Sequence, residues 1–256
     1  MRTKIAPIED DNLSDAWAKA FIAAMESPRG SLSRLVVTVR IPPNGVAAES
    51  TSIRGRLSDF LAERRESSID TISSTIFPNS LWNPGRPAQE LFERYERIWP
   101  RVKLCPANRN GVYFQRLIAF GDEKKPFNQL EHVLRTWRDY GNHRHSALQA
   151  AIFDPSKDHV NSRQRGFPCL QQLAFDAQGT NGSDGLIVTG FYATQTLLEK
   201  AYGNYLGLAR LGQFMAHELQ IPLKEVTCIA NVAKHAAKGR IRELQPLTSY
   251  LRSQLG

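Results

Sequence analysis

Cys169 is the residue whose type and setting are best suited to chemistry. It follows Pro168 directly and precedes residues 170–177, a strand-like run. A proline and a strand form a rigid support that could present a thiolate, the nucleophilic form of cysteine. A nucleophilic role needs a lowered pKa, and Arg163 and Arg165 are the nearest cations in sequence. The alternative is a buried structural cysteine, a common fate of free cysteines.

Hydrophobic spacing predicts the elements that must position this residue. We expect helices over 12–26, 88–98, 127–140, 205–219 and 241–251, with more helical material in 51–74. We expect strands over 34–41, 147–153, 170–177, 186–196 and 226–233. Turn-forming residues dominate 178–185 and predict a hairpin there. Because helices and strands mix without strict alternation, the pattern indicates an α+β fold with a substantial sheet.

Composition limits the class of protein. The chain has 256 residues and a net charge of +8, without a long basic block. The charge favours anionic partners such as nucleotides, folates or nucleic acid, and solubility alone is the alternative. No apolar run could span a bilayer, and the N-terminus lacks a signal-peptide core. Three scattered cysteines are too few for a disulfide framework or a zinc site, so we expect a cytoplasmic protein without a membrane partner.

Several short segments, taken in order, resemble the thymidylate synthase family. The segments are Asn110 to Arg116, similar to Gly-Pro-Val-Tyr-Gly-Phe-Gln-Trp-Arg; Gln129-Leu130, to Asp-Gln-Leu; Phe153-Asp154-Pro155, to Trp-Asn-Pro; Pro168-Cys169, to Pro-Cys-His; and Gly203-Asn204, to Pro-Phe-Asn. The resemblance is best over 111–252, and residues 1–110 diverge. It implies one thymidylate synthase-like domain over 1–256, with a large mixed sheet, flanking helices and a homodimer formed through the sheet.

The resemblance also implies roles for single residues. In that family a cysteine thiolate adds to C6 of a uracil ring, and C5 then takes a one-carbon unit from methylenetetrahydrofolate. Cys169 would be the nucleophile, Tyr113 the active-site tyrosine, and Asn204 the reader of uracil O4 and N3–H. An asparagine at that position favours uracil over cytosine. The alternatives are a core aromatic for Tyr113 and a helix N-cap for Asn204.

Other family positions are matched more loosely. The essential glutamate of the family falls within residues 66–71, where Asp70 or Glu66 could serve, and a solvated helix face is the alternative. The nucleotide-binding positions implied by the resemblance are Arg144, Arg165, Gln171 and His235. Of these, Arg144 would be donated across the dimer interface.

The chain also departs from the family pattern. Ala193 stands where the family has an arginine that grips the nucleotide phosphate, and Thr196 where it has an aspartate. The chain ends at Gly256 without the segment that closes over folate, which counts against methylenetetrahydrofolate as the donor.

Two functions therefore stay open. The first is a divergent methyltransferase or hydroxymethyltransferase acting at C5 of a pyrimidine nucleotide, a nucleoside or a base within a polynucleotide. The second is a non-catalytic nucleotide-binding or regulatory protein on the same fold. The reactivity of Cys169 discriminates between them. A nucleic-acid-binding protein, suggested only by the charge, is a third interpretation and predicts steep salt dependence.

Overall fold

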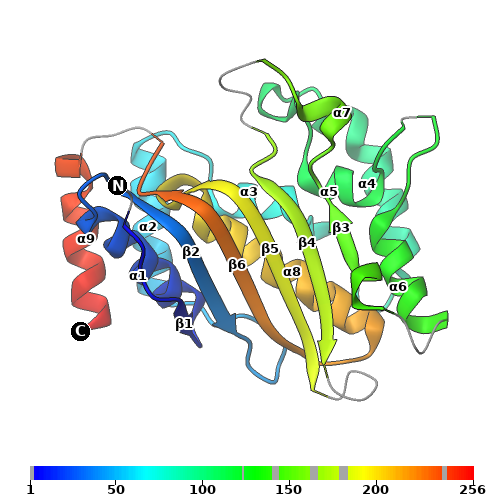
Figure 1. Cartoon of the computed structure of the whole chain (residues 1–256), viewed down its shortest axis with the longest axis horizontal. Coiled ribbons are helices and arrows are strands. Elements are labelled where there is room, and N and C mark those ends of the chain that lie inside the picture. The colour runs from blue at the N-terminus through cyan, green and yellow to red at the C-terminus, as the bar shows by residue number, and fades with distance from the viewer. Residues whose placement is uncertain (1–2, 123, 140–143, 162–166, 179–183, 238–240) are drawn as a thin grey trace.

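A six-stranded sheet with the strand order β1-β2-β6-β5-β4-β3 organises the computed structural model of this chain (Figure 1). The strands are β1 (Ile8–Asp10), β2 (Ser31–Arg40), β3 (Gln149–Ala151), β4 (Leu170–Gln178), β5 (Gly185–Thr196) and β6 (Leu223–Lys234). The β1–β2 and β5–β6 pairs are parallel and the other pairs antiparallel, so the sheet is mixed. The structure describes residues 3–122, 124–139, 144–161, 167–178, 184–237 and 241–256.

Helices flank this sheet. They are α1 (Leu13–Glu26), α2 (Thr51–Glu63), α3 (Ile69–Ile76), α4 (Ala88–Val102), α5 (Tyr113–Ile118), α6 (Gln129–Asp139), α7 (Pro155–Asp158), α8 (Tyr202–Leu219) and α9 (Ile241–Leu255). Short 3-10 turns lie at Asn79–Leu81, Pro106–Asn108 and His145–Ala147, and a π-helical turn, Leu197–Ala201, joins β5 to α8. In Figure 1, α8 runs behind the central strands, while α4 to α7 gather at the β3 end. None of the described helices is long and apolar enough to cross a membrane.

Helix α1 is held against the chain that leads into α8. The Asn12 side chain accepts a hydrogen bond from Ser14 N at 2.9 Å and caps the helix. Trp17 is fully buried, and its indole Nε1 donates to the Leu197 carbonyl oxygen at 2.8 Å. This contact fixes the start of the π-helical turn, and therefore the direction in which the following residues point.

Helices α3 and α8 approach each other closely through two glycines. A Cβ atom at Gly203 would lie 2.6 Å from Ile72 Cβ, and one at Gly207 would lie 2.9 Å from Ile76 Cβ. Any larger side chain would therefore push the helices apart. The absence of Cβ atoms brings α3 next to the beginning of α8, where Asn204 lies.

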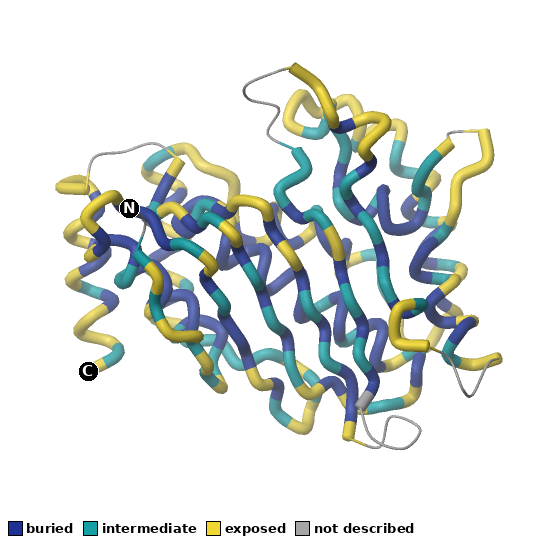
Figure 2. Tube along the Cα trace, viewed as in Figure 1, coloured by how far each residue is buried: buried dark blue, intermediate teal, exposed yellow. Residues whose placement is uncertain are grey.

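Burial alternates along the strands because only one face of the sheet is covered by helices (Figure 2). On β5, Val188 and Tyr192 are fully buried, whereas Phe191 is 41% exposed. Val36 on β2 and Ile229 on β6 are half-buried and lie in the same cross-strand row as Phe191. The sheet therefore carries a row of apolar side chains on its uncovered face.

The mixed α and β architecture with a large sheet is confirmed, and the element boundaries differ in places. The strand predicted over 147–153 covers only Gln149–Ala151, because the amides of Ile152 and Phe153 both turn to the Gln171 carbonyl oxygen, at 2.8 and 3.0 Å. The helix predicted over 88–98 continues to Val102 and includes Pro100, which has no N–H to donate to the carbonyl four residues before it, so the last turn of α4 lacks that hydrogen bond. The tip of the predicted hairpin, 179–183, lies outside the described residues, but β4 and β5 do pair antiparallel.

Candidate functional site

A cavity of about 330 Å³ brings together Cys169, Tyr113 and Asn204. Its walls come from α3, from the segment 107–113, from the C-terminal end of β5 and from the first turns after it. The three residues lie at the starts of three different elements. Cys169 directly precedes β4, Tyr113 is the first residue of α5, and Asn204 lies in the first turn of α8. The packing of these elements, rather than proximity in sequence, creates the site.

The backbone of Cys169 is held from two sides. Its N–H donates to the Tyr113 phenol oxygen at 3.3 Å, and its carbonyl oxygen accepts a hydrogen bond from Ala193 N at 3.0 Å. The ring of Phe167 packs on Tyr113 with the centroids 5.1 Å apart. Both Phe167 and Tyr113 line the cavity, so the cysteine sits on a fixed backbone beside aromatic surface.

Opposing effects act on the Cys169 thiol. Burial raises its pKa above the usual value, while the positive charge of Lys200 and the hydrogen bond from Tyr113 lower it; the net shift is upward. Burial also holds the pKa of Tyr113 well above its ordinary range, so the phenol keeps its proton. Lys200 lies on the π-helical turn and lines the cavity. It is a functional candidate that we did not identify from the sequence.

Asn204 presents a buried carboxamide to the cavity. The residue is only 4% exposed, and among the described residues its side chain makes no hydrogen bond. The helix-cap alternative is wrong, because α8 begins at Tyr202 and the preceding Ala201 occupies the cap position. A buried amide without a partner is costly unless water or a ligand supplies its hydrogen bonds. The arrangement therefore leaves a donor and an acceptor available to a polar ligand.

The wall behind these residues is fixed by a buried network around Gln195. The Gln195 Oε1 accepts a hydrogen bond from the Tyr205 hydroxyl at 3.3 Å, and its Nε2 lies 3.5 Å from Cys228 Sγ. Gln195 is 2% exposed, so its amide is committed to this network. Burial raises the pKa of Cys228 to about 12, which makes this second cysteine a structural thiol.

Asp70, for which the resemblance implied a catalytic role, does not line the cavity. Its carboxylate accepts hydrogen bonds from Arg54 at 2.9 Å and from Arg210 at 3.0 Å on the outer face of α3. Burial alone would raise the pKa of Asp70, and the two guanidinium groups more than offset that effect and lower it. The cavity instead receives Thr71 and Thr75 from α3, and none of its described lining residues is an aspartate or glutamate.

Two further predicted residues make structural contacts outside the cavity. Gln171 Nε2 donates to the Pro168 carbonyl oxygen at 2.8 Å and so braces the turn that carries Cys169. The Nδ1 atom of His235 donates to the Gly30 carbonyl oxygen at 2.7 Å. Neither residue lines the cavity, although Ala237, two positions beyond His235, does.

The structure describes only one of the two predicted arginines, Arg144. Arg144 is exposed, just before the short turn His145–Ala147, and does not line the cavity. Arg165 lies outside the described residues. Among the described residues, no group of three or more histidine, cysteine, aspartate or glutamate side chains is placed to hold a metal ion.

Sequence comparisons identify no relative that would assign this site: no protein-family model matches the chain, and no curated protein matches it.

Proposed function

We propose that the Cys169 cavity binds a uracil-type pyrimidine nucleotide or nucleoside, and that Cys169 adds to C6 of the ring as in the thymidylate synthase family. The observation that carries this proposal is the convergence of Cys169, Tyr113 and Asn204 on one cavity. Each residue was assigned from a separate short motif. If the three motif matches were fortuitous, there would be no reason for the three residues to line the same cavity.

The lining supplies what this addition needs. The thiolate sulfur forms a bond to C6, and the C5=C6 electron pair moves to C5 and O4 as an enolate. The Asn204 amide N–H would donate to O4 while its oxygen accepts N3–H, and the Lys200 ammonium favours the thiolate. C5 then takes a proton from water. Loss of the original C5 proton and expulsion of the thiolate regenerate the ring, so the net result is exchange of the C5 hydrogen.

The cavity does not fit methylenetetrahydrofolate beside a nucleotide. Its volume of about 330 Å³ is at the lower end of the range for one small-molecule ligand. The side chains of Lys200 and Thr196 also line this cavity together with Cys169, and they reduce the space for a second ligand. The proposal therefore ends at addition to C6 and includes no transfer of a one-carbon unit from folate.

Release of tritium from C5 of labelled dUMP and UMP tests this proposal. We expect release by the wild type and by Cys105→Ser, which removes an exposed cysteine outside the cavity, and none by Cys169→Ser. Asn204→Asp should favour exchange with dCMP over dUMP, because a protonated or ionised carboxyl suits the cytosine edge better than the uracil edge. Release that persists in Cys169→Ser would disprove the assignment of the nucleophile.

A non-catalytic nucleotide-binding protein is the second candidate, and two observations favour it. The described lining contains no carboxylate to organise protons around O4, and burial raises the pKa of Cys169. This function predicts saturable binding of dUMP or uridine without any C5 exchange. It also predicts that Asn204→Ala weakens binding, whereas Cys169→Ser leaves binding intact.

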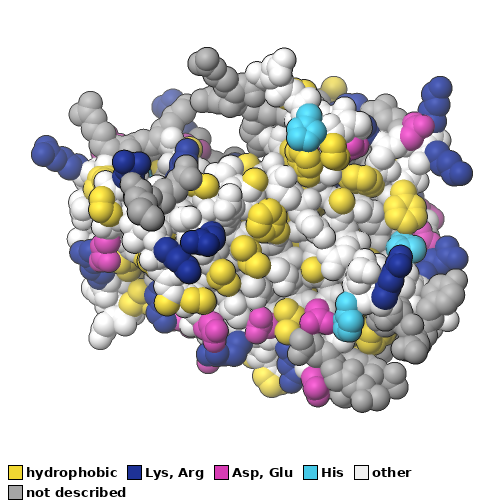
Figure 3. Space-filling view, viewed as in Figure 1, with side chains coloured by type: hydrophobic (Ala, Val, Ile, Leu, Met, Phe, Trp, Pro, Cys, Tyr) yellow, Lys and Arg dark blue, Asp and Glu magenta, His cyan; other side chains and the backbone are white. Residues whose placement is uncertain are grey.

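We also propose that two copies of the chain associate through the uncovered face of the sheet. Figure 3 shows hydrophobic side chains gathered at the centre of this face. Val36, Ile229 and Phe191 form the row described above, and Phe191 is 41% exposed. Such a row on a sheet without a covering layer is typical of a buried interface. The exposed Arg144 would then be available to a partner subunit.

The oligomeric state tests this association. We expect light scattering after size exclusion to give the mass of a dimer at micromolar concentration, and Phe191→Asp to give a monomer. Phe127→Asp is the matched control, since Phe127 is 51% exposed and lies outside the sheet. A wild-type monomer would overturn the association but would leave the proposal for the cavity untouched.

A further inference from the structure

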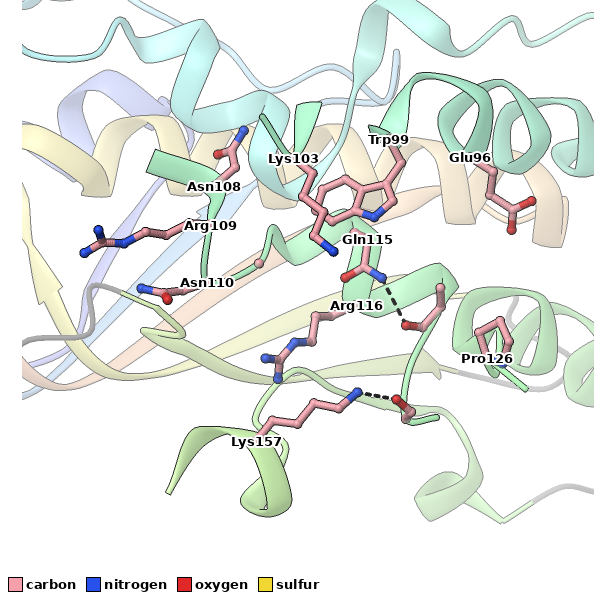
Figure 4. Close-up of a pocket in the computed structure, with 13 residues that line it drawn as sticks. Glu96, Trp99, Lys103, Asn108, Arg109, Asn110, Gln115, Arg116, Pro126 and Lys157 are labelled. Carbon is pink, nitrogen blue, oxygen red and sulfur yellow. Dashed lines mark hydrogen bonds between the residues drawn. The ribbon is translucent and has the colours of Figure 1, made fainter. Parts of the chain in front are cut away.

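A second cavity, of about 570 Å³, adjoins the Cys169 cavity. Asn108 and Gly111 belong to the walls of both. The remaining walls come from the C-terminal half of α4, from α5, from the segment that follows α5 and from α7 (Figure 4). The segment from Asn108 to Gly111 therefore borders both cavities.

Four cations among the described residues line this second cavity, and Lys103, Arg116 and Lys157 come from different elements. Lys103 follows α4, Arg116 lies on α5, and Lys157 lies on α7. Figure 4 shows the Lys103 side chain directed into the space above Arg116 and Lys157, whereas Arg109 points away from it. Arg116 is paired with Asp158, and Lys157 is paired with Asp154 at 3.8 Å and also donates to the Gly121 carbonyl oxygen. Lys103 forms no ion pair with any described residue. The cavity therefore holds a lysine that is available to an anion, next to two cations that are already paired with aspartates.

Among the described residues, acidic groups offset the charges of Arg116 and Lys157 but not that of Lys103. Glu96 is the only acidic residue among the described lining residues, and in Figure 4 its carboxylate lies apart from these three cations. Asp158 pairs with Arg116 through two hydrogen bonds at 2.6 and 3.0 Å, and Asp154 pairs with Lys157. A ligand with a negative charge would thus be favoured at Lys103.

Trp99 adds an aromatic surface to the same cavity. One side of its indole packs on Tyr95, with the ring centroids 6.2 Å apart and the planes 21° from parallel. The indole also lines the cavity and is half-buried. A partly exposed indole held by a second ring is a suitable platform for stacking a nucleobase. A cation and an aromatic platform in one cavity select an aromatic ligand that carries an anionic group.

We propose that this second cavity binds a nucleotide, with its phosphate at Lys103 and its base against Trp99. The inference rests on the proposed function for the pyrimidine in the neighbouring cavity. Because Asn108 and Gly111 line both cavities, the two ligands would lie side by side. The second nucleotide is then either a free co-substrate or the neighbouring unit of a single strand whose pyrimidine occupies the Cys169 cavity.

Calorimetric titration with AMP and with adenosine tests this site, because the pair differs only in the phosphate. We expect Lys103→Ala to weaken AMP binding about tenfold, as for a lost hydrogen bond to a charged group, and to leave adenosine binding unchanged. Arg101→Ala is the matched control, since it removes the same charge two residues earlier, in the last turn of α4, at an exposed position outside the cavity. Trp99→Leu should weaken both ligands.

The dinucleotide pdUpA separates the two sources of the nucleotide. If pdUpA binds more tightly than dUMP or AMP, and Lys103→Ala abolishes this gain in affinity, the second cavity binds the neighbouring nucleotide of a single-stranded nucleic acid. Equal affinities for pdUpA and AMP, with AMP still sensitive to Lys103, assign it to a free nucleotide. The inference is overturned if AMP and adenosine bind equally well or if Lys103→Ala and Arg101→Ala behave alike.

Cys169→Ser separates this inference from the proposed function. The variant should lose C5 exchange and retain AMP binding, because Cys169 lines only the first cavity. If the wild type shows no exchange while AMP binding still depends on Lys103, the proposed catalysis fails and the nucleotide site stands. If exchange occurs but AMP does not bind, the proposed catalysis stands and the nucleotide site in the second cavity fails.

Discussion

The phenol oxygen of Tyr113 accepts a hydrogen bond from the backbone N–H of Cys169 at 3.3 Å and so joins the start of α5 to the start of β4. Tyr113 also lies beside the thiol, and its pKa is held well above the ordinary range by burial. One tyrosine therefore both fixes the backbone of the cysteine and keeps a proton next to its sulfur.

Replacing Tyr113 by phenylalanine should slow the reaction of Cys169 with iodoacetamide. The change leaves the Cys169 N–H without its acceptor and removes the phenol hydrogen bond that favours the thiolate. We expect the labelling rate, followed by mass spectrometry in a Cys105→Ser background, to fall roughly tenfold, as for the loss of a hydrogen bond to a charged group. Tyr250→Phe, which removes the same atom on α9, is the control. Equal labelling rates for Tyr113→Phe and Tyr250→Phe would show that the Tyr113 hydroxyl group does not affect the Cys169 thiol.

The pH dependence of the same labelling reports the charge next to Cys169. Burial raises the thiol pKa above its usual value of 9.0, so we expect the rate to rise on the alkaline side of pH 9. Because the Lys200 ammonium lowers this pKa, Lys200→Met should move the midpoint to still higher pH, and Lys200→Arg should restore it. A midpoint below neutral pH in the wild type would instead mean a preformed thiolate.

The sequence was sufficient for the elements and for part of the site. Helices such as α1 and α8 and strands such as β5 have strong periodic patterns, so their positions were predicted to within a few residues. Cys169, Tyr113 and Asn204 were found through short motifs, and their meeting in one cavity depends on tertiary packing that no local pattern encodes.

Two residues, Asp70 and Lys200, lie where the sequence analysis did not expect them, and each difference has a physical reason. Asp70 was chosen for its residue type, although Ile69, Ile72 and Ile76 define the inward face of α3 and leave position 70 outside; this spacing could have excluded it. Lys200 was missed because a charged residue usually points to solvent, and the π-helical turn that directs it into the cavity has no sequence signature.

The contact between α3 and α8 predicts that Gly203→Ala is destabilising. The new methyl group would approach Ile72 Cβ at 2.6 Å and the Ile69 carbonyl oxygen at 2.8 Å, so α3 must shift. We expect a loss of about 1–3 kcal/mol in the free energy of unfolding, measured by urea denaturation. Because α3 supplies Thr71 and Thr75 to the cavity wall, dUMP binding should weaken as well.

Gly55→Ala on α2 is the control for this prediction. A Cβ atom at Gly55 would meet nothing within 4 Å, so only the helix propensity changes. We expect this substitution to stabilise the protein by about 0.5–1 kcal/mol. If both substitutions stabilise the protein, α3 and α8 have room to move apart and the close contact does not define the cavity.

The ion pair between Arg116 and Asp158 predicts the largest loss of stability. Their side chains are 9% and 1% exposed and share two hydrogen bonds, at 2.6 and 3.0 Å. Arg116→Ala leaves a buried carboxylate without its cation, which typically costs about 3–5 kcal/mol. Thermal unfolding should show a decrease in Tm on the order of 10 °C for a chain of this size.

The pair formed by Arg138 and Glu218 provides the comparison for Arg116→Ala, because its distance is similar, at 2.9 Å, while the Arg138 side chain is 49% exposed. Arg138→Ala should change the free energy of unfolding by only about 0–1 kcal/mol, since water screens the exposed charge. Arg116 also packs over Phe167 at 5.0 Å and lines the second cavity. Equal effects of the two substitutions would mean that water reaches Asp158 and screens its charge.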